Sequence, residues 1–178
     1  MLASISSGAD PIFVDATAET NHLPDYASQP VEILDRTVAV YICSPANPQG
    51  AVADRAYWTE LLTLAEKHDF RIFADECYSE IYRDTPPTGA LEVAAEMGAD
   101  PERVVAFHSL SKRSNLPGLR SGFVTGGPKT MDEIRQLRTY AGTPLPLPLQ
   151  MAAAAVWNDE EHVIENRALY QEKFAIVD

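Results

Sequence analysis

Stretches rich in apolar residues recur along the chain and alternate with amphipathic ones. Three of them, at 36–44, 70–76 and 103–110, combine apolar and β-branched residues, as is typical of strands buried on both faces of a parallel sheet. A shorter stretch at 11–16 and another at 119–127, which ends in a Gly-Gly-Pro break, predict two further strands. Five strands are therefore expected between residues 11 and 127.

The segments between and after these strands have helical periodicity. Trp58, Leu61 and Leu62 repeat at helical spacing in a helix predicted at 55–69, and Asp54 stands at its N-cap position. The other helices are predicted within 85–102 and at 129–141, 147–158 and 160–176. Strands that alternate with helices predict an α/β fold with an open sheet and helical crossovers.

Composition and charge narrow the classes of function. The chain has 178 residues and a formal net charge of −12, which argues against general binding to nucleic acid or to an anionic membrane. No window approaches the roughly 20 apolar residues that span a bilayer. Two cysteines without CxxC spacing favour a reduced, cytoplasmic protein, and four scattered histidines give no expectation of a metal site.

One long stretch contains no acidic residue although the chain as a whole is acidic. No Asp or Glu occurs from Arg103 to Met131, whereas the chain holds 26 acidic residues, so about four would be expected there at the average density. The same stretch contains Lys112, Arg113 and Arg120. This pattern indicates that an anion binds close to these cations.

Polar residues with distinct chemistry follow the predicted strands, at the edge where open α/β sheets bind ligands. The amine of a lysine can attack a carbonyl, and hydroxyls with a guanidinium suit a phosphate dianion. A carboxylate can hold a protonated pyridine nitrogen, while a phenol and an amide can donate to a ring oxygen. These groups together describe pyridoxal phosphate. The residues are Asn47, Asp75, Tyr78, Ser109, Ser111, Lys112 and Arg120.

Three motifs in order carry a family resemblance. NPQG at 47–50, DECY at 75–78 and SLSKRSNLPGLRSG at 109–122 resemble the signatures of class I/II aminotransferases, pyridoxal-phosphate enzymes of fold type I. The resemblance implies a three-layer α/β fold with a mostly parallel sheet. It also implies that residues 1–178 form part of the cofactor-binding large domain, with about 160–178 beginning the helix toward a C-terminal domain.

The same resemblance assigns roles to the site residues. Lys112 is expected to hold the cofactor's aldehyde and to move a proton. Asp75 is expected to partner the pyridine nitrogen, and Tyr78 and Asn47 to donate to the phenolic oxygen. The expected phosphate ligands are Ser109, Ser111 and Arg120. The competing interpretations are a helix cap for Asp75, a turn former for Asn47 and a Ser111 side chain that faces away from the ligand.

Expectations for substrate and partners also follow from the resemblance. DECYSEIY, SLSKRSNLPGLRSGF and AVWNDEEHVIENRALYQEKF most resemble the bacterial succinyldiaminopimelate aminotransferases of lysine biosynthesis. The wider family resemblance implies an amino acid and a 2-oxo acid as substrates and a homodimer. The alternatives are another reaction on the same scaffold, such as a lyase or cyclase, or a truncated, non-catalytic chain. The motifs that bind the substrate carboxylate are expected outside this sequence. Of the neighbouring residues, His108 is expected to face away from the serines, and Arg113 to pair with a surface or partner-chain carboxylate.

Overall fold

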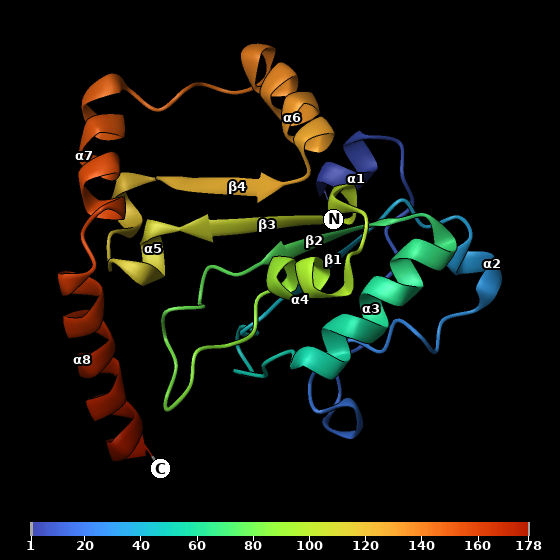
Figure 1. Cartoon of the computed structure of the whole chain (residues 1–178), viewed down its shortest axis with the longest axis horizontal. Coiled ribbons are helices and arrows are strands. Elements are labelled where there is room, and N and C mark those ends of the chain that lie inside the picture. Colours follow the sequence, from blue (N-terminus) through green and yellow to red (C-terminus); the bar gives the residue numbers. More distant parts are fainter. Residues whose placement is uncertain (1, 178) are drawn as a thin grey trace.

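A mostly parallel sheet forms the centre of the computed structural model, which describes residues 2–177. Within that range the strands are ordered β1-β2-β3-β4 (Figure 1). Strands β1 (Ala39–Cys43), β2 (Arg71–Asp75) and β3 (Val104–Ser109) are parallel, and β4 (Gly122–Gly126) runs antiparallel to β3. The predicted fold class is confirmed.

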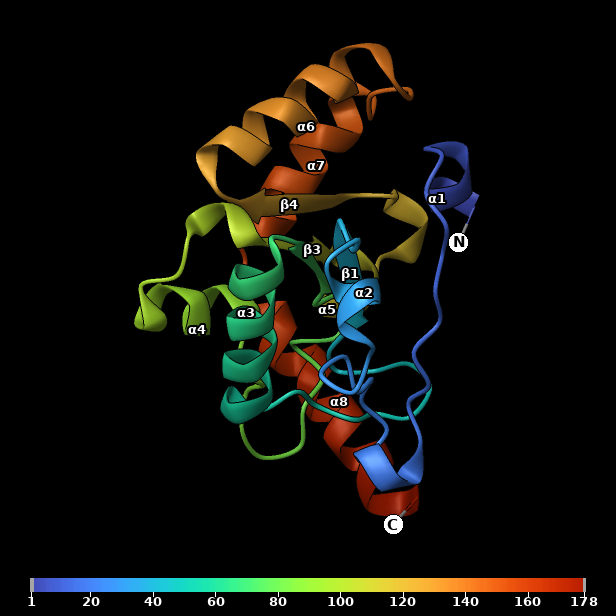
Figure 2. The same cartoon turned by 90° about the vertical axis from the view of Figure 1, so that its right-hand side faces the viewer.

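Two crossover helices cover one face of the sheet. Helix α3 (Arg55–His68) connects β1 to β2, and α4 (Ala90–Met97) lies between β2 and β3; both lie on the same side (Figure 2). The carboxylate of Asp54 accepts a hydrogen bond of 2.8 Å from the Tyr57 amide, so the predicted N-cap starts α3. Parallel neighbours need such crossovers.

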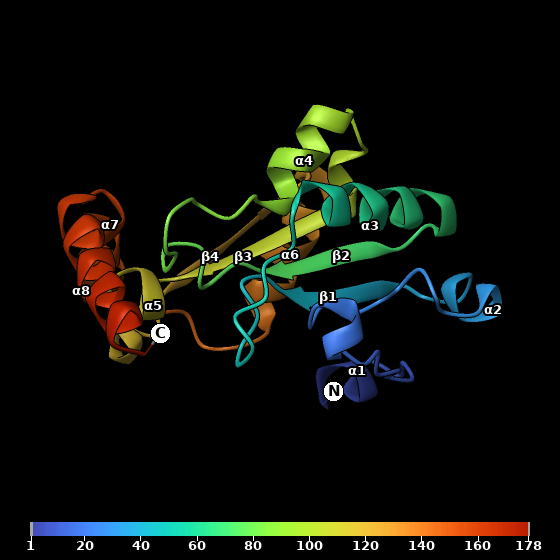
Figure 3. The ribbon, with the colours of Figure 1, turned by 90° about the horizontal axis from the view of Figure 1, so that it is seen from below.

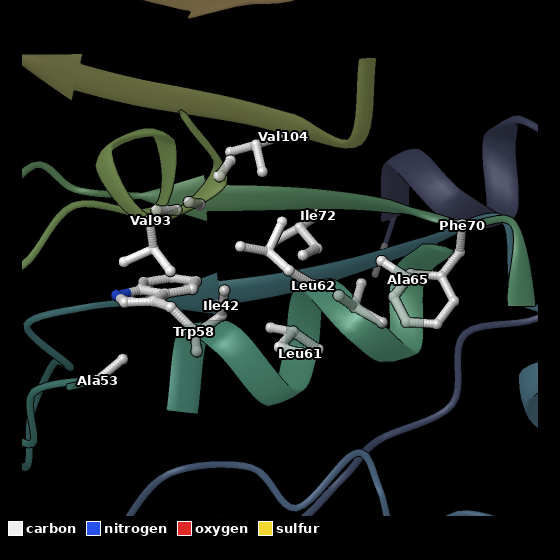
Figure 4. Packing of buried hydrophobic residues seen from close by; sticks show 14 of the residues in the cluster. Ile42, Ala53, Trp58, Leu61, Leu62, Ala65, Phe70, Ile72, Val93 and Val104 are labelled. Carbon is white, nitrogen blue, oxygen red and sulfur yellow. The ribbon is translucent and has the colours of Figure 1, made fainter. Parts of the chain in front are cut away.

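The hydrophobic core lies between these helices and the sheet. Trp58, Leu62 and Ile72 have no solvent exposure, and Figure 4 shows their side chains between α3 and the strands. The indole of Trp58 donates to the Thr88 carbonyl at 3.0 Å, so its one polar atom is satisfied. Burial of this face fixes which side chains point to the other face, because residues alternate along a strand.

The opposite face of the sheet carries aromatic side chains. The Tyr41 and Phe73 ring centroids lie 5.0 Å apart and those of Phe73 and Phe107 5.9 Å apart, both edge to face. Tyr41 is 61% exposed. The N-terminal segment with α1 (Leu2–Ser6) runs on this side of the sheet (Figure 3).

The remaining elements complete the chain. The shorter ones are η1 (Ala18–Thr20), α2 (Val31–Leu34), η2 (Pro101–Arg103), α5 (Leu110–Arg113) and η3 (Pro117–Leu119). The long helices after β4 are α6 (Pro128–Tyr140), α7 (Leu147–Trp157) and α8 (Glu161–Val177). Helices α5, α7 and α8 gather at the end of the sheet where β3 terminates (Figures 1 and 3).

The prediction of a strand at 11–16 is wrong. Residues 9–17 form no regular element, and Phe13 is 74% exposed. A strand needs a neighbour to pair with its backbone groups, and the described sheet begins at β1 instead. The helix predicted at 160–176 forms as α8; that it leads to a C-terminal domain stays a prediction.

Candidate active site

The turn that carries Lys112 begins where β3 ends. Ser109 is the N-cap of α5, and its hydroxyl accepts a hydrogen bond of 3.1 Å from the Ser111 amide. The two serine hydroxyls are 2.8 Å apart. The strand thus passes into one helical turn, which presents two linked hydroxyls just before the lysine. The Ser111 hydroxyl therefore lies next to the Ser109 hydroxyl, and that both face a cofactor phosphate stays a prediction.

The Lys112 amine lies over the ring of Tyr78. The distance from Nζ to the ring centroid is 5.5 Å. Tyr78 also accepts a hydrogen bond of 2.8 Å at its hydroxyl from the Asn47 side-chain amide. The loop that carries Asn47 is closed by a 2.7 Å bond from the Gly50 amide to the Ala46 carbonyl. Three of the residues expected in the site therefore meet, although 65 positions separate the first from the last in the printed sequence.

Asp75 ends β2 on the aromatic face of the sheet. It is exposed and aligns with Cys43 on β1 and Phe107 on β3. Ser109 is two residues beyond Phe107 on the same strand, so its side chain shares that face. One carboxylate oxygen of Asp75 accepts a 3.1 Å bond from the Cys77 amide, which holds the side chain at the strand end.

The Asp75 carboxylate affects the two cysteines beside it. Burial, then the hydrogen bond and the charge of Asp75, raise the pKa of the Cys77 thiol from 9.0 to about 12. Burial and the same charge also raise the pKa of Cys43. Both thiols are therefore poor nucleophiles, since the thiolate is the reactive form.

Arg120 follows the tight connection between α5 and β4. Its φ of 52° is left-handed, and its guanidinium donates to the Pro117 carbonyl at 2.8 Å. The backbone carbonyl of the next residue, Ser121, accepts hydrogen bonds from the Leu110 amide at 3.1 Å and from the Ser109 hydroxyl at 3.4 Å. The backbone next to Arg120 is therefore hydrogen-bonded to the start of α5, at Ser109 and Leu110. Arg120 itself is exposed.

The other face of the same strand ends holds a buried carboxylate that the sequence analysis missed. Glu76 accepts a 2.8 Å bond from the Ala90 amide and lies 3.6 Å from His108 Nε2. Burial raises the pKa of Glu76. His108 stacks on Phe123, with 4.9 Å between ring centroids, and so faces away from the serine cluster as expected. The signal for Glu76 was its place next to Asp75, since neighbours in a strand point to opposite faces.

The side chain of Arg113, the last residue of α5, is buried. Its guanidinium donates to the Val156 carbonyl at 3.2 Å, forms an ion pair with Glu160 and lies 4.9 Å from the centroid of the Trp157 ring. Pairing with a surface carboxylate was expected. Arg113 therefore links α5 to the junction between α7 and α8.

These groups fit the chemistry of pyridoxal phosphate. The edge of the sheet presents an amine, a phenol with an amide, a carboxylate and a pair of hydroxyls, and each suits one part of that molecule. Among residues 2–177, no cluster of three or more His, Cys, Asp and Glu side chains could hold a metal ion. Over the same range, no helix combines the length and apolarity needed to cross a membrane.

Comparison with known families decides the class. The model of the family described as aminotransferase class I and II matches residues 7–177. The chain belongs to this aminotransferase family. The match covers all three motifs in which the resemblance was found, and with it the residues that surround Lys112.

Curated relatives of this chain are named as aminotransferases or transaminases. It is 34% identical over 176 residues to the LL-diaminopimelate aminotransferase of Dehalococcoides mccartyi, covering 97% of this chain and 44% of that protein. It is 35% identical over 146 residues to the 4-dedimethylamino-4-oxo-anhydrotetracycline transaminase OxyQ of Streptomyces rimosus, covering 82% and 39%. The chain thus spans less than half the length of these relatives.

Solved structures agree with the fold. An aminotransferase from Neisseria meningitidis matches with a TM-score of 0.91 and 45% identity, over 97% of this chain and 44% of that one. A probable N-succinyldiaminopimelate aminotransferase from Thermus thermophilus matches with a TM-score of 0.83 and 26% identity, over 96% and 45%. The arrangement of strands and helices is therefore that of aminotransferases.

Proposed function

We propose that this chain carries the cofactor-binding part of a pyridoxal-phosphate-dependent aminotransferase. The observation that carries the proposal is the contact of the Lys112 amine with the ring of Tyr78, whose hydroxyl is bonded to Asn47. Pyridoxal phosphate supplies an aldehyde that bonds to amines and an electron-poor ring that accepts negative charge. Family membership supports the same assignment.

In this proposal each residue has a stated task. Lys112 would hold the aldehyde through its amine, with loss of water, and the same amine when free could accept and return a proton. Asp75 supplies the negative charge that a protonated ring nitrogen requires, and Tyr78 with Asn47 donates to the ring oxygen. The hydroxyls of Ser109 and Ser111 and the guanidinium of Arg120 bind the phosphate.

The substrate of the whole protein is the finer part of the proposal. We favour transfer of an amino group between succinyldiaminopimelate and 2-oxoglutarate, because relatives act on diaminopimelate or carry the succinyldiaminopimelate name. LL-diaminopimelate is the competing substrate. A homodimer in the cytoplasm is the proposed state, and the two free cysteines fit that compartment. The alternatives are a lyase or cyclase and a chain that binds cofactor without turnover.

Absorbance spectroscopy tests the cofactor assignment. Pyridoxal phosphate added to the chain should produce a visible band, and borohydride should then fix one cofactor on Lys112, as located by peptide mass spectrometry. Lys112→Ala should abolish the band. Lys173→Ala is the matched control, because its amine also lies over a tyrosine ring, at 4.7 Å from Tyr170, on α8. Equal labelling of both variants would refute the assignment.

Product analysis separates the reaction classes. Release of glutamate from 2-oxoglutarate, dependent on succinyldiaminopimelate, supports the favoured substrate. The same release with LL-diaminopimelate alone would replace it. A cofactor band that shifts with amino donors without release of a 2-oxo acid would leave binding intact and refute transamination by this chain.

A further inference from the structure

The helical turn that carries Lys112 is too short to hold its own backbone in place. Helix α5 has four residues, and its end is marked by a 3.1 Å bond from the Ser114 amide to the Leu110 carbonyl. One isolated turn has no intrinsic stability, because nucleation fixes several residues for a single hydrogen bond. The last carbonyls of a helix also lack partners within it. Something outside α5 must therefore hold the lysine's backbone.

Asn166 in α8 supplies those partners. Its side-chain Nδ2 lies 3.2 Å from the carbonyl oxygen of Lys112 and 3.2 Å from that of Arg113. A side-chain amide carries two N–H donors on one nitrogen, so it can serve both carbonyls at once. Figures 1 and 3 show α8 next to the end of the sheet where α5 lies. A residue 54 positions away in sequence thus caps the lysine turn.

The same end of α8 makes a second attachment one turn earlier. His162 places Nε2 2.8 Å from the Ser114 hydroxyl and Nδ1 2.8 Å from an Asp159 carboxylate oxygen. Serine, histidine and aspartate also occur together in hydrolases, but Ser114 is only 8% exposed and its oxygen accepts from Arg113 at 3.3 Å. The hydroxyl is therefore used internally, and this row of side chains is an anchor.

We propose that Asn166 is a positioning residue for Lys112. By capping the two carbonyls at the end of α5, it fixes the Lys112 backbone and so limits the volume that the amine explores beside Tyr78. A reacting group held in place behaves as if it were at high local concentration. The proposal rests on the function proposed for Lys112, and it assigns to α8 a direct part in the site.

Two substitutions remove the cap in different ways. Asn166→Ala deletes the donors, and Asn166→Asp keeps the shape but replaces the donating nitrogen with an oxygen that only accepts. Gln171→Ala is the matched control, because its amide lies on the same helix and donates to a backbone carbonyl, that of Arg83 at 2.7 Å, away from α5. All three variants lose one side-chain amide from α8.

Two measurements on the full chain decide the outcome. Amide hydrogen exchange at Ser114, whose N–H bonds to Leu110, should become about tenfold faster in both Asn166 variants and remain unchanged in Gln171→Ala. The rate of covalent addition of pyridoxal phosphate to Lys112 should fall about fivefold in the Asn166 variants only. Thermal melting of all variants tests whether a general loss of stability explains either change.

The results separate this proposal from the proposed function. Unchanged exchange at Ser114 in the Asn166 variants, or an equal change in Gln171→Ala, would overturn the positioning role. Faster exchange without slower addition would also overturn it, because α5 would then be anchored with no consequence for the amine. If the unaltered chain forms no adduct at Lys112, the function proposed for Lys112 fails, while the exchange data still decide whether Asn166 anchors the turn.

Discussion

The charge of Asp75 can be tested through the thiol next to it. Cys77 has its pKa raised from 9.0 to about 12, first by burial and then by the Asp75 carboxylate. The chain has two cysteines, so Cys43→Ser leaves Cys77 as the only thiol. The perturbation is Asp75→Asn in that background, which removes the charge and nearly conserves the shape.

The size of the effect follows from the pKa. A rise of about three units leaves about a thousandfold less thiolate at a pH near 8. The more basic thiolate is about twentyfold more nucleophilic toward a disulfide, for a Brønsted coefficient of about 0.45. Cys77 should therefore react about fiftyfold more slowly with dithionitrobenzoate in the folded chain than in urea. Asp75→Asn should recover part of that factor, with burial responsible for the rest.

The pH dependence of the reaction rate distinguishes a raised thiol pKa from steric shielding of the thiol. Shielding slows the reaction equally at every pH, whereas a raised pKa moves the pH at which the rate stops increasing. The rate for folded Cys77 should still rise at about pH 10, and Asp75→Asn should move the plateau to lower pH. An unchanged plateau in Asp75→Asn would refute the idea that the Asp75 charge raises the pKa of this thiol. A plateau at about pH 9 in the folded Cys43→Ser chain would refute the raised pKa itself.

Three further predictions concern stability. Leu62→Ala should cost about 2–5 kcal/mol in urea unfolding because Leu62 is fully buried, and Thr63→Ala on the exposed side of α3 is its control. Asp54→Ala should cost about 1 kcal/mol in the same assay, through loss of the α3 cap; an unchanged midpoint would contradict that role. The Thr130 hydroxyl lowers the pKa of Glu102 from 4.5, so this carboxylate stabilises the fold above that pH and loses its effect as pH falls through the lowered pKa. Glu102→Gln should therefore be less stable at neutral pH and approach the unaltered chain in acid, and a gap independent of pH would contradict the linkage.

The parallel strands could be located from the sequence because each of them coincides with a run of apolar and β-branched residues. Strands β1, β2 and β3 fall within the runs at 36–44, 70–76 and 103–110. Val40, Ile42 and Ile72 are buried on the helix side, whereas Tyr41 on the other face is 61% exposed, so the expected burial on both faces is not observed for β1. The stretch at 11–16 has the same local character but forms no strand. Local preference does not supply a neighbouring strand, so an isolated apolar stretch is a weak predictor of β-structure.

Part of the candidate site could also be predicted from the sequence. Asn47 and Tyr78 were expected near each other because both follow parallel strands, and a 2.8 Å hydrogen bond joins them. The role of Asn166 could not be read in the same way. An asparagine in a helix is an ordinary residue, and only the packing of α8 against α5 brings its amide to the Lys112 carbonyl.

Adjacent carboxylates at the end of β2 show how strand geometry assigns different tasks to similar groups. Asp75 projects to the exposed aromatic face, which Ser109 shares, while Glu76 projects to the buried face and accepts a bond from the Ala90 amide. A shift of one residue in the pairing with β3 would exchange the two. A 3.0 Å bond from the Glu76 amide to the Phe107 carbonyl holds that register. Asp75→Asn therefore removes a charge from the candidate site. Glu76→Gln leaves the aromatic face unchanged and alters only the buried contacts on the other side of the sheet. Comparison of the two variants separates the effect of charge in the site from the effect of packing next to it.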